Sequence, residues 1–161
     1  MEAEEDPMSA EFEILTVLNR YLHAIDTRNL DGIRDCFAED ASAIYSGEVG
    51  AQNTRAEIVR AIERAGAVSQ DVWGASMHAL ANWHIQVTSE TTAQSSIMVE
   101  AVLADAPRGS GKGVRRGLRY TDKLVKTPDG WRIKARRHEL IWSCPFEGAS
   151  VTGARMAPAA N

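Results

Sequence analysis

Residues 21–41 read YLHAIDTRNLDGIRDCFAEDA, and this stretch decides how the first part of the chain folds. Apolar side chains recur at intervals of three and four over residues 10–26, which is the spacing of an amphipathic helix. Asn29 is placed to cap a second, short helix, whose apolar stripe covers residues 30–37. Residues 42–47, with the sequence SAIYSG, predict a short strand after these two helices.

The rest of the chain predicts one more helix and then only strands. Residues 54–66 have a capping box at the start and Gly66 as a stop signal, so they predict a third helix. This order predicts an α+β fold, in which three N-terminal helices pack on one face of a curved antiparallel sheet. A cone-shaped sheet of this kind leaves room for a small ligand between the sheet and the helices. The long strands are expected at residues 78–89, 91–104, 114–126 and 131–142.

Length and composition indicate one globular domain. The chain has 161 residues, of which 44% are hydrophobic and 25% are charged. We expect the domain to span residues 9–147, with a flexible acidic tail at 1–8 and a flexible tail at 148–161. The net charge is −4, and no aromatic stacking pattern accompanies the basic residues of 108–137, so we expect no binding to nucleic acid.

The sequence also predicts the cellular location of the protein and the absence of a metal and a cofactor. No apolar run approaches the ~20 residues that cross a bilayer, and the N-terminus has no secretory signal pattern. Cys36 and Cys144 lie far apart, which favours reduced thiols in a cytoplasmic protein that does not bind membranes. No spacing of Cys and His fits a zinc site, and no glycine-rich phosphate loop is present. We therefore expect no metal and no cofactor.

Four segments together resemble the SnoaL-like group of the nuclear-transport-factor-2-like superfamily. They are residues 21–41, HALAN at 78–82, RYTDKLVK at 119–126 and GWRIKARRHELIW at 130–142. The resemblance covers residues 10–143 and implies an α+β cone that forms a homodimer or homotrimer. Members of this group include dehydratases, a dehydrochlorinase and polyketide cyclases. The wider superfamily also has binding-only proteins and accessory subunits, so the fold alone fixes no function.

Asp26 and His78 are the first candidates for catalysis. The resemblance implies that Asp26, at the end of the first helix, holds His78, at the start of the first long strand, as a general base. A buried carboxylate fixes the tautomer of an imidazole and raises its basicity. Taken alone, Asp26 also fits a helix-terminal cap and His78 an ordinary histidine at a strand edge. The competing histidines are His23, His84 and His138.

Tyr21 and one arginine of the last strand complete the predicted catalytic set. Tyr21 could donate a hydrogen bond to a substrate carbonyl or to a leaving hydroxyl. The resemblance favours Arg136 as the arginine that stabilises a leaving group or an enolate. Strict alternation from Trp131 favours Arg137 instead, and a β-bulge would decide between the two. The further candidates, for substrate binding, are Tyr45, Glu100, Tyr120 and Arg137.

These residues predict a cofactor-independent lyase or isomerase, either a dehydratase or a cyclase, for example in secondary metabolism. The expected substrate is a small, hydrophobic, oxygenated molecule that loses a proton to His78. The alternative is a non-catalytic small-molecule-binding protein or accessory subunit of the same fold. A third possibility is an epoxide hydrolase, which would need an Asp/Arg/Asp set; Arg119 and Asp122 lie on one predicted strand.

Overall fold

The computed structural model describes residues 7–46, 50–65, 74–105 and 111–149. These residues form three helices and six strands, and the predicted α+β class is confirmed. The elements are α1 (Pro7–Asp26), α2 (Leu30–Asp35), β1 (Phe37–Tyr45), β2 (Gly50–Gln52), α3 (Arg55–Arg64), β3 (Ala75–Ser89), β4 (Thr92–Ala104), β5 (Gly113–Thr127) and β6 (Gly130–Phe146).

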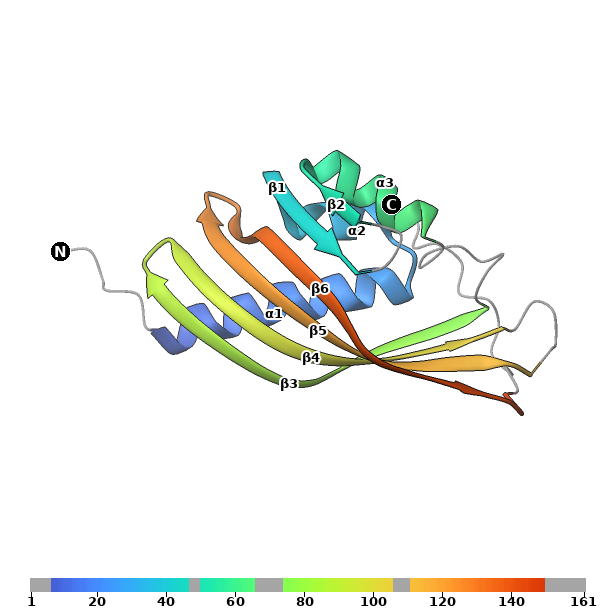
Figure 1. Ribbon diagram of the computed structural model, residues 1–161. Coiled ribbons are helices and arrows are strands. Elements are labelled where there is room, and N and C mark those ends of the chain that lie inside the picture. Colours follow the sequence, from blue (N-terminus) through green and yellow to red (C-terminus); the bar gives the residue numbers. More distant parts are fainter. Residues whose placement is uncertain (1–6, 47–49, 66–73, 106–110, 150–161) are drawn as a thin grey trace.

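The six strands form one curved sheet, and the helices lie on one side of it (Figure 1). The strand order is β2-β1-β6-β5-β4-β3. All neighbours are antiparallel except β1 and β6, which run parallel, so the sheet is mixed and not wholly antiparallel as predicted. The parallel pair arises because β1 joins the edge of β6, a strand about ninety residues later in the chain, and not a sequence neighbour.

The end of the second helix and the start of the strand after it differ from the prediction. Helix α2 ends at Asp35, and Phe37 already belongs to β1, where it pairs with Ile133 of β6. The side chains of Cys36 and Phe37 are fully buried. The sequence alone could not place them correctly, because a short apolar run fits the end of a helix and the start of a strand equally well. Strand β2 was not predicted, since it has only three residues.

The third helix begins as predicted. The Thr54 hydroxyl accepts a hydrogen bond from the backbone N–H of Glu57, and the Glu57 carboxylate accepts one from the N–H of Asn53. The predicted stop at Gly66 lies outside the described residues, as do most of the two predicted tails. Helix α1 begins at Pro7, before the predicted start of the domain at residue 9.

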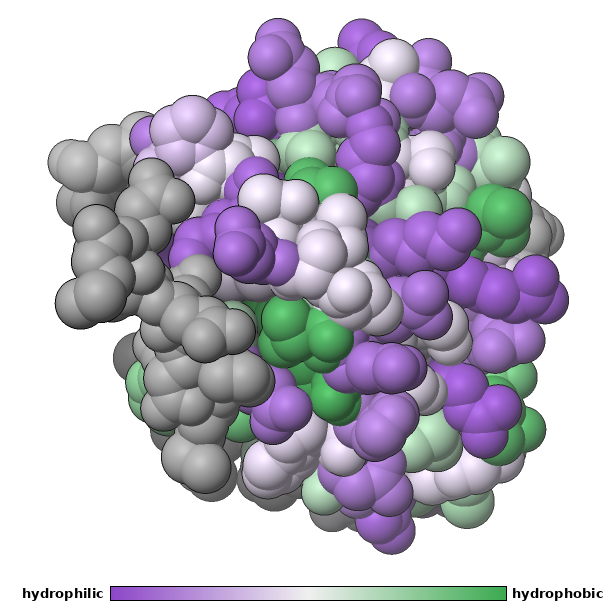
Figure 2. All heavy atoms as spheres, turned by 90° about the vertical axis from the view of Figure 1, so that its left-hand side faces the viewer, coloured by the Kyte–Doolittle hydropathy of each residue, from purple (hydrophilic) through white to green (hydrophobic). Residues whose placement is uncertain are grey.

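The core lies between the helices and the concave face of the sheet. Apolar residues of α1, such as Ile14 and Leu18, are fully buried, and so are inward residues of the strands, such as Ile97 and Leu124. The end of the molecule that carries the β3–β4 hairpin and the start of α1 has a mostly hydrophilic surface, with hydrophobic residues in small separate patches (Figure 2). The core thus closes one end of the cone, and the cavity described next lies toward the other.

Candidate active site

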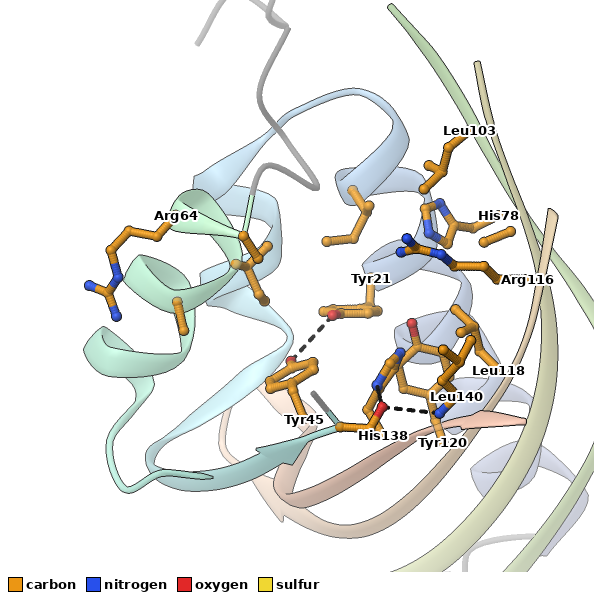
Figure 3. A pocket seen from close by; sticks show the side chains of 16 residues that line it. Tyr21, Tyr45, Arg64, His78, Leu103, Arg116, Leu118, Tyr120, His138 and Leu140 are labelled. Atoms are coloured by element: carbon orange, nitrogen blue, oxygen red, sulfur yellow. Dashed lines mark hydrogen bonds between the residues drawn. The ribbon is translucent and has the colours of Figure 1, made fainter. Parts of the chain in front are cut away.

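A cavity of about 620 Å³ lies between the helices and the sheet (Figure 3). This volume falls within the range of roughly 300–1,000 Å³ that is usual for small-molecule sites. Side chains from α1, α3 and five strands or strand ends line it, and they are Tyr21, Ile25, Tyr45, Ser46, Ala61, Ile62, Arg64, Ala65, His78, Ala101, Leu103, Arg116, Leu118, Tyr120, His138 and Leu140.

The end of α1 positions Asp26. Arg28 adopts a left-handed backbone conformation with φ of 57°, and its N–H donates to the carbonyl of Ile25 at 3.1 Å. The N–H of Asn29 donates to the carbonyl of Ala24 at 2.9 Å, which completes the Schellman pattern that ends a helix. Asp26 therefore lies in the last turn of α1, next to β3, with which this helix packs.

Asp26 and His78 make two hydrogen bonds with each other. The Oδ1 atom of Asp26 lies 2.7 Å from the Nδ1 atom of His78, and its Oδ2 atom accepts the backbone N–H of His78 at 2.7 Å. The Ser76 hydroxyl donates to the same carboxylate at 2.9 Å. A carboxylate at Nδ1 assigns the proton to that nitrogen. The other ring nitrogen, Nε2, is then the basic atom of a histidine that lines the cavity.

The surroundings of Asp26 keep its carboxyl group ionised. Burial raises the pKa of this group, but the hydrogen bonds and the charge of His78 outweigh burial and hold the pKa below its usual value. The C-terminal end of a helix is a poor place for a negative charge, because the helix dipole is negative there. Asp26 thus depends on Ser76 and His78 for its stability as an anion.

Three tyrosines line the cavity, and all three were predicted as site residues. The hydroxyl oxygens of Tyr21 and Tyr45 lie 3.3 Å apart, and the ring of Tyr21 meets that of Tyr120 edge-on at 6.0 Å between centroids. Burial raises the pKa of each of these phenols above its ordinary value. They therefore remain protonated near neutral pH and can donate hydrogen bonds.

His138 also lines the cavity, although the sequence offered it only as a competitor of His78. Its Nδ1 atom lies 3.3 Å from the Ser46 hydroxyl oxygen, which accepts the backbone N–H of Leu140 at 3.0 Å. The Ser46 oxygen still has a lone pair free, so either Nδ1 or the hydroxyl can donate in this contact, according to the tautomer of His138. Burial, followed by the charge of Arg136, lowers the pKa of His138 to about 4, so its ring is neutral.

Arg136 lies beneath the cavity and not in it. A β-bulge at Lys134 turns Arg136 inward, since Ile133 pairs with Leu124 and Ala135 pairs with Lys123. The Arg136 guanidinium donates two hydrogen bonds to the carboxylate of Asp122, at 2.8 and 2.7 Å, and both side chains are fully buried.

The rings of Tyr21 and Tyr120 cover the guanidinium of Arg136, with their centroids 4.2 and 4.6 Å from Cζ. Burial would lower the pKa of Arg136, but the Asp122 carboxylate raises it well above its usual value. The predicted direct contact of Arg136 with a substrate does not fit this geometry, because the rings and Asp122 surround the charged group. Arg136 instead supports the floor of the cavity.

Two other predicted binding residues lie outside the cavity. Glu100 points to the outer face of the sheet, by which we mean the face away from the helices, and forms an ion pair there with Arg115. Arg137 is exposed and lies 3.2 Å from the carboxylate of Glu139. Both predictions were wrong because alternation along a strand sends each of these side chains away from its inward neighbour, Ala101 or Arg136.

The competing histidines and the epoxide hydrolase set are also placed away from the cavity. A register shift after Leu80 turns His84 outward, opposite Ser96 of β4, and His23 is exposed on α1. Arg119 is exposed, whereas Asp122 is buried against Arg136 from the opposite face of β5. The arrangement that an epoxide hydrolase would need is therefore not assembled from these two residues.

Arg116 is a cavity residue for which the sequence gave no specific signal. It is one of several basic residues on β5, and alternation with Leu118 and Tyr120, which also line the cavity, is what distinguishes it from them. Among the described residues, no group of three or more His, Cys, Asp or Glu side chains is arranged to hold a metal ion. Within the same residues, no helix has the length and apolar character to cross a membrane.

Comparison with known proteins gives relatives in sequence and in structure. Uncharacterised proteins of Mycobacterium bovis and Mycobacterium tuberculosis are 28% identical over 129 residues, which cover 80% of this chain and 84% of theirs. A hexachlorocyclohexane dehydrochlorinase, LinA-type3 of Novosphingobium barchaimii, has a TM-score of 0.76 at 13% identity and covers 91% of this chain and 97% of its own.

A second solved structure, from Novosphingobium aromaticivorans, belongs to a protein whose assignment as a scytalone dehydratase is provisional. It has a TM-score of 0.75 at 19% identity and covers 96% of this chain and 97% of its own. At such low identity these structures establish the fold. The sequence model of the SnoaL-like domain matches residues 6–137, which is most of the chain. The chain therefore belongs to the SnoaL-like domain family.

Proposed function

We propose that this protein is a cofactor-independent lyase or isomerase, in which His78 removes a proton from a carbon atom of a small oxygenated substrate. The observation that carries the proposal is the hydrogen bond of 2.7 Å between Asp26 and Nδ1 of His78, with the same histidine lining a cavity. The side chain of His78 is only 8% exposed, so the base is shielded from bulk water. General bases of this kind work best in a closed site near their substrate.

The proton transfer proceeds as follows in this proposal. The Nε2 atom of His78 takes a proton from the carbon next to a carbonyl group, and Asp26 stabilises the imidazolium that forms. The neutral phenols of Tyr21 and Tyr45 donate hydrogen bonds to the enolate oxygen, on which the negative charge develops. When the β-carbon carries a hydroxyl group, this group takes the proton from His78 and leaves as water. The reaction is then a dehydration.

A cyclase would use the same first step. The enolate carbon would attack a second carbonyl group of the same molecule, and the alkoxide so formed would recover the proton from His78. Only the substrate distinguishes the two outcomes, since both require one base and donors for one oxyanion. The apolar part of the lining, which includes Leu103, Leu118 and Leu140, suits a hydrophobic carbon skeleton in either case.

The test is elimination from a panel of β-hydroxy ketones built on one or two rings, followed by the absorbance of the conjugated product. His78→Gln should lower kcat/KM by about 10²–10⁴-fold on any substrate found, the range typical for loss of a general base. His84→Gln is the matched control, because His84 lies on the same strand but points outward. Equal activity of His78→Gln and the unaltered protein would contradict the proposal, because the proton would then be removed without His78.

We also infer that two copies associate through the outer face of the sheet. This face lacks helical cover and exposes Met77 and Trp142, which are 55% and 44% accessible. The indole of Trp142 lies against Gly117, because a Cβ added at that glycine would be only 2.1 Å from the indole Nε1 atom. The absence of a side chain at Gly117 therefore lets the indole pack on the strand. Sedimentation analysis should give the mass of a dimer for the unaltered protein and of a monomer for Met77→Lys/Trp142→Lys. A monomeric unaltered protein would contradict this proposal.

A further inference from the structure

Arg116 brings a positive charge into the cavity, and no described residue forms an ion pair with it. Its Nε atom is buried and has no hydrogen-bond acceptor among the described residues. Arg116 and His78 pair with Ala101 from its two sides, and both line the cavity (Figure 3). Burial of the Nε–H group without an acceptor costs free energy, so a ligand that supplies the acceptor would be favoured.

Two other arginines of β5 and β6 have carboxylate partners, in contrast to Arg116. Arg115, the residue before Arg116, points to the outer face and pairs with Glu100. Arg136, which is fully buried, is paired with Asp122. Arg116 differs from both, because its inward position on β5 has no carboxylate opposite it.

The charges around the cavity favour an anion. Arg116 points into the cavity, whereas the guanidinium of Arg64 is exposed and points away from it (Figure 3), and none of the described lining residues is Asp or Glu. The nearby Asp26 carboxylate is occupied by the donors of Ser76 and His78. A carboxylate is the acceptor that matches the planar fork of a guanidinium, with two parallel hydrogen bonds.

We propose that the substrate of this cavity carries a carboxylate group, which Arg116 binds while the hydrophobic skeleton contacts Leu103, Leu118 and Leu140. The proposal rests on the function given above and narrows its substrate class to hydrophobic carboxylic acids. Arg116 then fixes one end of the substrate beside His78. The carbon that loses its proton is placed by this anchor, so Arg116 acts as a binding residue for the reaction.

The test compares two probes of nearly equal shape, 2-naphthoate and 2-naphthamide, by isothermal titration calorimetry at constant ionic strength and pH 7.5. The unaltered protein should bind the naphthoate at least about tenfold more tightly than the naphthamide, as expected for a charge-assisted pair. Arg116→Gln should abolish this preference and leave the affinity for the naphthamide unchanged. Arg115→Gln, with the same change of charge on the opposite face, should keep the preference.

Three results would overturn the proposal. They are equal affinity of the unaltered protein for both probes, no measurable binding of the naphthoate at millimolar concentration, and equal losses in Arg115→Gln and Arg116→Gln. If Arg116→Gln binds neither probe, the Arg116→Lys variant is measured instead. Because it keeps the positive charge, it must still bind the naphthoate more tightly than the naphthamide if the proposal holds. His78→Gln should keep that preference even where turnover is lost. If the protein prefers the naphthoate but turnover does not depend on His78, the anion site is supported and the proposed role of His78 as the base is refuted.

Discussion

His78 and His138 line one cavity but have different partners at Nδ1. Nδ1 of His78 meets the carboxylate of Asp26, which leaves Nε2 as an acceptor of protons. Nδ1 of His138 meets the Ser46 hydroxyl, which can donate or accept, so this contact leaves both tautomers of the neutral ring open. A carboxylate partner assigns the ring proton, whereas a hydroxyl partner does not. A base and a neutral imidazole thus line the same cavity.

His138 makes the stability of the protein depend on pH. In the folded protein its pKa is about 4, below the ordinary value of 6.5, so between these values the unfolded chain binds more protons. The contribution of His138 to stability is therefore complete above pH 6.5 and is lost as the pH falls toward 4. The free energy of unfolding should decline more steeply in the unaltered protein than in His138→Gln, by at most about 1.4 kcal/mol per pH unit.

Urea unfolding between pH 7.5 and 4.5 measures this difference. Each protein is compared with itself at pH 7.5, so a constant loss of stability caused by the substitution does not affect the slope. His23→Gln serves as the control, because His23 is exposed on α1. Parallel pH profiles for His138→Gln and the unaltered protein would contradict the assigned environment of His138.

A single β-bulge in the last strand, β6, determines which of its side chains face the cavity. The bulge at Lys134 directs Arg136 toward Asp122 and His138 into the cavity, and it leaves Arg137 exposed. Without an extra residue at this point, alternation from Ile133 would turn Arg137 inward. The bulge therefore positions both the buried ion pair under the tyrosines and His138.

Removal of one partner of the ion pair between β5 and β6 should destabilise the folded protein more than removal of both partners. Asp122→Asn leaves the buried guanidinium of Arg136 without a counter-charge and should cost about 3–5 kcal/mol. Asp122→Leu/Arg136→Met removes both charges and should cost less. Chemical denaturation checks the two variants. A loss under about 1 kcal/mol for Asp122→Asn would show that the pair does not depend on its charges.

The molecule as a whole could be predicted from its sequence where the determining contacts are local. The helices, the Thr54 cap and the hairpins follow from spacing and turn residues, and the order of these elements predicted the α+β cone that the family resemblance also implies. The pairing of Asp26 with His78 at hydrogen-bond distance was expected from the same resemblance, and the structure places the two side chains there. Their catalytic role stays a prediction.

Features that depend on distant contacts were missed. The parallel pairing of β1 with β6 joins segments far apart in the sequence, so periodicity gave no sign of it. The register shifts in β3 and β6 decide whether His84 and Arg136 face inward, and they appear only when strands are paired. Glu100 and Arg116 were misjudged or overlooked for the same reason, because the face that a strand presents to the cavity is fixed by its neighbours.

The central claim is that Asp26 acts through His78, and a double-mutant cycle of turnover tests it most directly. Asp26→Asn, His78→Gln and the double variant are compared with the unaltered protein on a substrate from the elimination panel. We predict that the double variant is no slower than His78→Gln alone, since residues that act as one unit lose their effect together. Losses of kcat/KM that multiply across the two substitutions would contradict the claim, because Asp26 and His78 would then act independently.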